Sequence, residues 1–506
     1  MDFGQAELNL FETLWALAPE LILLLTGALI LGLDLGQRRK PQPWLPYVAL
    51  GGTFLAGIAT LSLWPLAQQA PLAVLYVFRL DGFALIVQAL ALIALGIVIL
   101  SAEDFIRANT REPAFFYALL LFTTLAIMLL SGAVNLVMIF LAFDAVSLFS
   151  ALLAGFLRDD ERSVEAAFKY FLYGAALSAV MLYGMSWIYG IFGTTDLVEI
   201  GTKFLQIGTR TEAAFYPLLM GSLIMILVGL AFKVAAVPFH QWAPDAYEGA
   251  PTPVTAFFSI GPKLAGFALL LRMTTLLIPD TPLYLIPGNW QRLIVALAAL
   301  TMTLGNLVGL MQTNVKRLLA YSSIAQAGYM LVGVAALASQ VAEPAQRAIT
   351  AVLLYLLAYG VTNLGVFAVV ILVGNQQGSY EIGDFAGLHK RAPLAAFVLA
   401  LGMISLAGIP PTAGFVGKLW LFSAAIEADL LWLAVLGVLN SVISLGYYWK
   451  LIRAAYLQSG TEASLPLTGW LKATLILTTV LVLGLGIIPG VVLPALEAAG
   501  RVLWGS

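Results

Sequence analysis

Long apolar runs recur along almost the whole chain and constrain its fold more than any other feature. A transmembrane helix needs about 20 consecutive apolar residues, and segments such as Ala114 to Leu130 approach that length without a charge. The chain of 506 residues is 61% hydrophobic and 10% charged, whereas charged residues make up about a quarter of an ordinary soluble domain. A water-soluble fold cannot bury so much apolar surface. The sequence therefore predicts an all-α integral membrane protein, with one membrane domain over residues 1–506.

The spacing of these runs predicts about fourteen transmembrane helices. The start from Met1 to Thr13 lacks a basic segment, so the first run is expected to be a span and not a cleavable signal peptide. The predicted spans are 14–35, 44–65, 81–101, 114–130, 134–157, 164–192, 215–238, 253–278, 293–311, 318–337, 349–373, 394–426, 431–456 and 471–493.

Composition excludes several classes of function. The net charge is -2 and no tract is dense in lysine and arginine, so we expect no nucleic-acid partner. The chain has no cysteine and two histidines, which excludes disulfides, thiolate zinc sites and ordinary iron–sulfur ligation and leaves no case for haem. We therefore expect no cofactor in this chain, and any electron transfer must take place on a partner.

Basic residues gather in the loops after odd-numbered spans, among them Arg38, Arg107, Arg158, Lys316 and Lys390. Loops rich in lysine and arginine stay on the cytoplasmic side of a membrane. Both termini are therefore predicted to lie on the non-cytoplasmic side. The sequence is equally compatible with a bacterial inner (plasma) membrane and a thylakoid membrane.

Two predicted spans are interrupted by proline. Pro238 lies in AFKVAAVPFHQWAPDAYEGAPTP, and Pro410 and Pro411 lie in SLAGIPPTAGFVGKLWLF. Proline removes a backbone hydrogen bond, and the irregular backbone that results is tolerated inside a membrane only where it is buried in protein or lines water. The two broken segments are an odd number of spans apart, so they cross the membrane in opposite directions, as the halves of an inverted repeat do.

This symmetry predicts two inverted five-helix repeats, each containing a broken helix. The first repeat is expected over residues 114–278 and the second over 291–458. The N-terminal helices would then occupy 1–113, and a C-terminal helix would occupy 466–506.

Four charged residues lie inside apolar sequence and are the candidate functional residues. Asp144 is near the middle of its span, where an ionised carboxylate costs about 2.5 to 3.5 kcal/mol. Lys263 follows Pro262 within a span, Lys418 follows the double proline by about two turns, and Lys233 precedes the first break. The alternative is that the acid stays protonated and caps a helix, and that the lysines extend their heads to an interface.

Desolvation disfavours a charged lysine, whereas a nearby carboxylate favours it, so moving the partner loads or releases a proton. Asp144 with the three lysines could therefore pass protons laterally between water-filled half-channels, with irregular backbone holding the water. His240, just after the first break, is a candidate relay because histidine titrates near neutral pH. The polar stripe Tyr321, Ser322, Ser323, Gln326 and Tyr329 could line water or join helices.

Four strings resemble the antiporter-like subunits of respiratory complex I (NADH-quinone oxidoreductase). They are EAAFKYFLYGAALSAVMLYG from Glu165, AFKVAAVPFHQWAPDAYEGAPTPVTAFFS from Ala231, VKRLLAYSSIAQAGYM from Val315 and LAGIPPTAGFVGKLWLF from Leu406. Within that group the chain is most similar to the NuoN type, called NdhB in cyanobacteria and chloroplasts. The resemblance covers most of the chain beyond Val134.

The resemblance implies a proton-translocating subunit whose partners are the other complex I membrane subunits and, through them, a peripheral redox arm. That arm would oxidise NADH or ferredoxin and reduce quinone, with flavin and iron–sulfur clusters on partner subunits. It also implies roles for the charged residues: Lys233 beside the first break, Lys263 in the next span, Lys418 in the second broken helix, and Asp144 as the acidic partner. The family usually has glutamate at the position of Asp144, so a direct contact with Lys233 is left open.

Two other functions remain compatible with the sequence. A subunit of a multi-subunit cation/proton antiporter has a similar fold and would exchange sodium for protons without a redox arm. A purely structural membrane subunit would use its buried charges only to fix the register of its helices.

Overall fold

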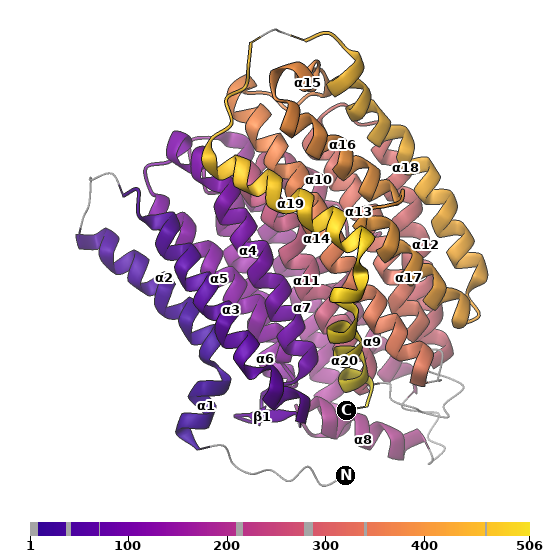
Figure 1. Cartoon of the computed structure of the whole chain (residues 1–506). Coiled ribbons are helices and arrows are strands. Elements are labelled where there is room, and N and C mark those ends of the chain that lie inside the picture. Colours follow the sequence, from indigo (N-terminus) through magenta and orange to yellow (C-terminus); the bar gives the residue numbers. More distant parts are fainter. Residues whose placement is uncertain are drawn as a thin grey trace.

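The structure, a computed structural model, describes residues 9–36, 42–69, 71–208, 216–277, 287–337, 342–460 and 463–505. Nearly all of this part is helical, as the apolar pattern predicts, and the helices lie roughly side by side (Figure 1). The first half contains α1 (Leu10–Ala16), α2 (Ala18–Gly36), α3 (Leu45–Gln69), the antiparallel strands β1 (Leu72–Val74) and β2 (Phe78–Leu80), α4 (Gly82–Asn109), α5 (Pro113–Gly132), α6 (Leu136–Ala154), α7 (Glu161–Phe192), α8 (Leu197–Gly208), α9 (Tyr216–Val234), α10 (Trp242–Gly249) and α11 (Thr252–Leu277).

The second half is equally helical. It contains α12 (Pro287–Gly309), α13 (Val315–Ala336), α14 (Ala342–Gln377), the 3-10 helix η2 (Ile382–Phe385), α15 (Leu388–Arg391), α16 (Pro393–Ala407), α17 (Ala413–Glu427), α18 (Leu431–Leu457), α19 (Gly469–Ile487), the 3-10 helix η3 (Pro489–Val491) and α20 (Leu493–Trp504).

Thirteen helices of the described chain are long and apolar enough to cross a membrane. The fourteenth predicted span, 394–426, is two shorter helices, α16 and α17, separated at the double proline. The predicted first span is also divided, since α1 ends at Ala16 and α2 begins at Ala18, and the last ends at Ile487, earlier than predicted. The hydropathy pattern therefore locates the spans, but their ends depend on local caps and breaks.

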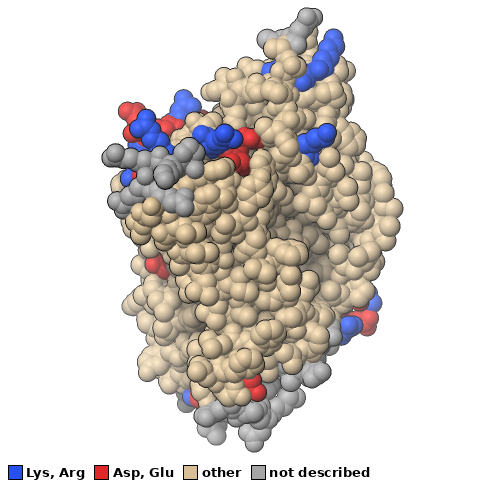
Figure 2. All heavy atoms as spheres, turned by 60° about the vertical axis from the view of Figure 1, so that its left-hand side comes forward, with Lys and Arg blue, Asp and Glu red and all other residues tan. Residues whose placement is uncertain are grey.

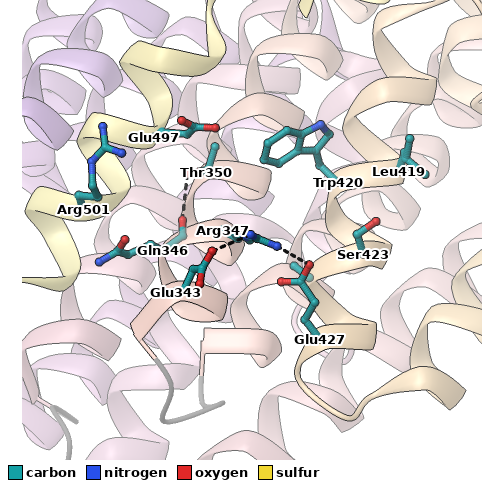
Figure 3. A pocket seen from close by; sticks show the side chains of 11 residues that line it. Glu343, Gln346, Arg347, Thr350, Leu419, Trp420, Ser423, Glu427, Glu497 and Arg501 are labelled. Atoms are coloured by element: carbon teal, nitrogen blue, oxygen red, sulfur yellow. Dashed lines mark hydrogen bonds and ion pairs between the residues drawn. The ribbon is translucent and has the colours of Figure 1, made fainter. Parts of the chain in front are cut away.

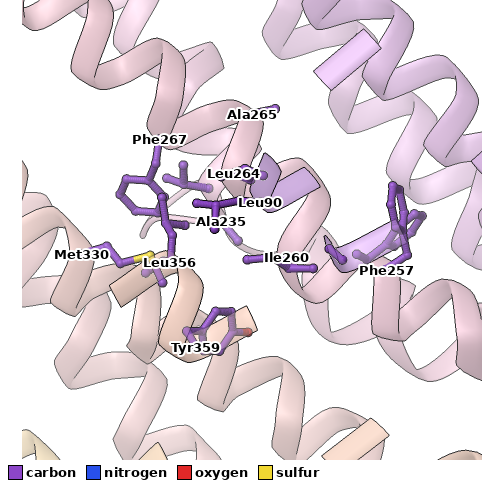
Figure 4. Close-up of a cluster of buried hydrophobic side chains, with 14 of the residues drawn as sticks. Leu90, Ala235, Phe257, Ile260, Leu264, Ala265, Phe267, Met330, Leu356 and Tyr359 are labelled. Carbon is purple, nitrogen blue, oxygen red and sulfur yellow. The ribbon is translucent and has the colours of Figure 1, made fainter. Parts of the chain in front are cut away.

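The centre of the molecule is formed by α11, α13 and α14. All 26 residues of α11 are buried, including Pro262, and its apolar side chains lie close to Met330 of α13 and Leu356 and Tyr359 of α14 (Figure 4). Outer helices instead expose large apolar side chains such as Phe54, Leu141 and Val442. On the face shown in Figure 2, most charged groups lie toward the two ends and leave a broad, mostly apolar band between them. This distribution is the one that a lipid environment requires.

A buried ion pair connects the N-terminal helices to α11. Arg272 donates through both terminal nitrogens to the two Asp81 oxygens at 2.9 Å each, and its Nε donates to the Ser131 carbonyl. Both side chains of the pair are fully buried, although Asp81 lies at the end of a span. Burial raises the pKa of Asp81, but Arg272 and Arg79 more than offset this and lower it below its ordinary value. The pair is structural, because both of its charges are permanently matched.

Several short elements lie at the ends of the spans and are absent from the hydropathy pattern. The β1–β2 hairpin, α8 and the end of α20 lie at the lower end in Figure 1, and α15 lies at the upper end. The segment 466–506, predicted as one C-terminal helix, contains the spanning helix α19 and the separate helix α20. The division of 114–278 and 291–458 into inverted repeats stays a prediction.

Candidate functional site

The first break separates α9 from α10 at Ala235 to Gln241, and side chains bind the backbone groups that it frees. Val237 donates its N–H to Thr301 Oγ1 at 3.0 Å, and Trp242 Nε1 donates to the Phe232 carbonyl at 3.0 Å. The Val237–Pro238 peptide is cis, and Ala235 has a φ of 58°. Side chains from outside the break therefore satisfy the Val237 N–H and the Phe232 carbonyl.

Lys233 is the penultimate residue of α9, just before this break, and its side chain is fully buried. The Nζ atom donates to Ser147 Oγ at 2.5 Å and to the Phe143 carbonyl at 3.2 Å, both on α6, and lies 4.1 Å from the centre of the Phe143 ring. The ammonium therefore stays inside the protein and does not extend to an interface. Its contacts are with neutral oxygens and a ring face.

Asp144 lies on α6 between the two residues that contact Lys233, but the acid and the lysine do not form an ion pair. Its Oδ1 accepts a hydrogen bond of 3.4 Å from Ser178 Oγ on α7, and the side chain is half-buried. Lys233 of α9 thus contacts α6 on either side of Asp144 without bonding to its carboxylate. A water between them would complete the contact.

Lys263 lies on the buried helix α11 and reaches α13. Its Nζ donates to the Ser323 carbonyl. The Ser323 hydroxyl bonds with the hydroxyls of Tyr247 and Tyr359 at 2.9 and 2.8 Å, and Asn363 donates to the Tyr359 oxygen at 3.2 Å. Lys263 is therefore anchored at one end of a group of buried hydroxyls.

The second break holds Lys418. The helix α16 ends at Ala407, Gly408 takes a φ of 86°, and α17 begins at Ala413. From α17 the Lys418 Nζ turns back and donates to the free carbonyls of Leu406 and Ala407 at 2.9 and 3.1 Å, and to Ser441 Oγ on α18 at 3.0 Å. A cation at a helix C-terminus also matches the negative end of the helix dipole.

The polar stripe on α13 joins the surroundings of Lys263 to those of Lys418. Next to Ser323, the Ser322 hydroxyl bonds with the Tyr448 hydroxyl at 2.5 Å. Gln326 donates to that same Tyr448 oxygen at 3.1 Å and to the Leu406 carbonyl, which Lys418 also binds, at 3.2 Å. The Tyr355 hydroxyl donates to Gln326 Oε1. Of the two roles left open for this stripe, joining helices is thus observed directly.

His240 lies in the break between α9 and α10 and is half-buried. Its Nδ1 atom is buried and has no hydrogen-bond partner among the described residues. The structure records no contact between this ring and any of the three lysines, so it does not bring His240 into the site that they form. The relay role stays a prediction.

Sequence reasoning missed two hydroxyl groups between α6 and α7. Ser150 is one turn beyond Ser147 on α6, and the Tyr170 hydroxyl of α7 faces it. Both side chains are buried, and neither hydroxyl oxygen has a partner in hydrogen-bond geometry within the described chain. The sequence did indicate part of this arrangement, because Ser147 and Ser150 are three residues apart and therefore lie on the same face of α6. The tyrosine that faces Ser150 comes from another helix, so local spacing does not predict it.

A network of ion pairs holds the short helix α10 in place. Asp245 of α10 accepts from Lys169 of α7 at 2.6 Å and from Arg317 of α13 at 2.9 Å. Arg317 also binds Glu248 at 2.8 Å, and Lys316 donates to the Glu248 and Ala250 carbonyls at 2.8 and 2.6 Å. The broken segment after Lys233 is therefore fixed between α7 and α13.

The three intramembrane lysines share one electrostatic property. Each is buried, and across the described residues every hydrogen-bond acceptor of their Nζ atoms is a carbonyl or a serine hydroxyl. A buried charge without a fixed counter-charge is easily neutralised by loss of its proton. The arrangement is thus able to take up and release protons, in contrast to the matched pair of Asp81 and Arg272.

Comparisons with known proteins identify the family and the fold. Residues 133–444 match the transmembrane family described as NADH:quinone oxidoreductase/Mrp antiporter. The chain is 44% identical, over 93% of its length and 94% of the relative's, to NADH-quinone oxidoreductase subunit N 2 of Symbiobacterium thermophilum. It is similar, with a TM-score of 0.78 and 32% identity, to a chain of respiratory complex I from Thermus thermophilus, covering 95% of this chain and 99% of that one.

A second structural likeness concerns the fold alone. A chain of the Mrp complex from Dietzia superposes with a TM-score of 0.81 at 22% identity, over 98% of both chains.

Proposed function

Since this chain belongs to the family of antiporter-like membrane subunits of NADH-quinone oxidoreductase, of the subunit N type, we propose that Asp144, Lys233, Lys263 and Lys418 carry its protons across the membrane. The chain is a subunit of a translocase. Its own part in the reaction is proton movement, driven by electron transfer on partner subunits.

One observation carries the assignment of these residues. The three lysine ammonium groups are buried and bind only neutral oxygens in the described chain. If these lysines served only to fix helix positions, a matched carboxylate would be expected beside each, as Asp81 stands beside Arg272. Without such a partner, the protonation of each lysine is free to respond to a neighbouring charge.

The order of the groups suggests a lateral path. A proton held by Lys233 next to Asp144 would pass to Lys263, and then along the hydroxyl and amide groups of α13 to Lys418 at the second break. The two breaks expose irregular backbone beside the first and last lysines, where water can be held. His240 lies in the first break and is a further candidate relay.

The proposed partners follow from the family. The other membrane subunits of the complex would contact this chain within the bilayer and connect it to a peripheral redox arm. NADH or ferredoxin, flavin, iron–sulfur clusters and quinone would be bound by those partners, and none by this chain. From the basic loops we propose that both termini lie on the non-cytoplasmic side of a bacterial inner membrane or a thylakoid membrane.

The test is proton pumping by the intact complex in sealed vesicles. Lys233→Met, Lys263→Met and Lys418→Met each remove one ammonium group while keeping most of the side-chain volume. Each variant is expected to lower the number of protons moved per quinone reduced. The matched control is Lys472→Met. Because Lys472 is exposed on α19, its replacement should leave the number of protons moved per quinone reduced unchanged.

The outcomes separate the alternatives. Unchanged pumping in all three variants, with the complex assembled, would refute the proton-carrying role and favour a structural subunit. Proton movement that requires sodium and needs no quinone reduction would favour the cation/proton antiporter. The fold alone does not decide between these, since the Mrp chain has a similar one.

A further inference from the structure

A cavity of about 480 Å³ lies between α14, α17 and α20, away from the lysines described above (Figure 3). It is formed where α14 begins and α17 ends, which places it at one end of the membrane-spanning helices. Thr350, Gln346 and Ser423 give it polar groups, and Trp420 and Leu419 give it an apolar side. Its volume lies in the range of about 300 to 1,000 Å³ that is common for small-molecule sites.

The C-terminal helix α20 is one wall of this cavity, and Gly500 allows its close approach to α14. A Cβ atom at Gly500 would lie 2.8 Å from the Gln346 carbonyl and 2.9 Å from Thr350 Oγ1. The apolar residues Leu496 and Leu503 of α20 are buried, while Glu497 and Arg501 line the cavity. The helix therefore packs tightly and presents one acid and one base to the same space.

The charges around the cavity fall into two groups. Arg347 is fully engaged, since it binds Glu343 at 2.7 Å and Glu427 at 2.9 Å. Glu497 and Arg501 are one helical turn apart, yet neither side chain has an ion-pair or hydrogen-bond partner in the described structure. Two opposite charges are thus available to a ligand, about one turn of helix from each other.

We propose that this cavity binds the headgroup of a zwitterionic phospholipid that carries a primary ammonium, such as phosphatidylethanolamine. The phosphate would bind Arg501, and the ammonium would bind Glu497. The glycerol and the first part of the acyl chains would lie against Trp420 and Leu419, whose side chain is 52% exposed to the surroundings.

Charge complementarity favours this ligand over simple ions. A free anion would meet three glutamates around the cavity, and a free cation would meet two arginines. A headgroup with both charges satisfies both available residues at once. The position also suits a lipid, because the cavity joins an apolar lining to the charged end of the spanning helices, where headgroups lie.

The test measures which lipid the intact complex keeps. The complex is reconstituted in nanodiscs with equal amounts of phosphatidylethanolamine and phosphatidylglycerol, and lipids retained on this subunit are counted by native mass spectrometry. Glu497→Gln is expected to lower the ratio of ethanolamine to glycerol lipid by about two- to fivefold, the range for a partly exposed ion pair. Arg501→Gln is expected to lower the retention of both lipids, because both contain the phosphate.

A control with the same change in charge separates the cavity from general surface effects. Glu112 and Arg158 form an exposed ion pair elsewhere on the chain. Glu112→Gln, the control for Glu497→Gln, and Arg158→Gln, the control for Arg501→Gln, should each leave lipid retention and its ratio as in the wild type. The proposal is overturned if Glu497→Gln leaves the ratio unchanged, if the control alters it equally, or if a protein segment occupies the cavity in the assembled complex. These outcomes are independent of proton pumping.

Discussion

Replacing Gln326 by leucine is expected to slow the transfer of protons between Lys263 and Lys418 while leaving both lysines in place. The amide is the side chain that joins the two environments, since it binds Tyr448 and the Leu406 carbonyl and accepts from Tyr355. Leucine has a similar size but no polar atoms. The change therefore removes the connection without a large change in packing.

The magnitude follows from the hydrogen bonds that are lost. After the change, the Leu406 carbonyl still accepts a hydrogen bond from Lys418 at 2.9 Å, and the Tyr448 hydroxyl still bonds with Ser322. The buried Tyr355 hydroxyl, in contrast, loses the one hydrogen-bond partner recorded for it. Leaving one buried hydroxyl unpaired costs about 1 to 3 kcal/mol. If the same free energy raises the barrier to transfer, the pumping rate falls by about 5- to 150-fold.

The assay follows quinone reduction and acidification together in vesicles that contain the intact complex. Fewer protons per quinone are expected for the Gln326 variant. The control is Thr123→Val, which removes a buried hydroxyl bonded only within α5, to the Leu119 carbonyl. The reasoning is refuted if Lys263→Met abolishes pumping but Gln326→Leu moves as many protons per quinone as the wild type. That result would show that protons do not follow α13.

Three further predictions concern other parts of the chain. Arg272→Met should destabilise the protein by about 3 to 5 kcal/mol, since it removes the bidentate partner of the buried Asp81 and leaves that charge only the longer contact with Arg79; adding Asp81→Asn should recover part of the loss, measured by thermal unfolding in detergent. Tyr170→Phe should leave both stability and proton pumping unchanged, because its hydroxyl is unpaired and lies outside the proposed path, as should Tyr183→Phe, on the exposed face of α7; a loss of pumping in the Tyr170 variant alone would show that the path includes this hydroxyl. Gly500→Ala should displace α20 and cost about 1 to 3 kcal/mol, because its methyl group would overlap the backbone of α14; unaltered stability would refute this packing argument.

Much of the membrane architecture was accessible from the sequence, because hydropathy is a local property. Runs of apolar residues located the spans, and the prolines at 238 and 410–411 marked the two broken helices that the structure contains. The lysines at 233, 263 and 418 stood out because charge is rare in such runs. Their burial confirms that they lie inside the protein, while their roles in proton transfer remain proposals.

Other features depended on which helices become neighbours, and no local pattern contains that information. Asp81 lies at the start of a span, and it is buried because Arg272, far away in the sequence, lies against it. The facing hydroxyls of Ser150 and Tyr170 and the cavity beside α20 likewise come from separate helices.

Hydropathy and charge along the chain are enough to predict a multispanning membrane protein with two broken helices and a small set of intramembrane charges, because the bilayer acts on each segment separately. The contacts of the lysines with neutral oxygens, and the connection that Gln326 makes between two of them, became visible only in the folded molecule. The same holds for Asp144, which turns to α7 and does not pair with Lys233. Hydrogen-bond partners of buried polar groups are set by side-chain packing between helices, which is non-local.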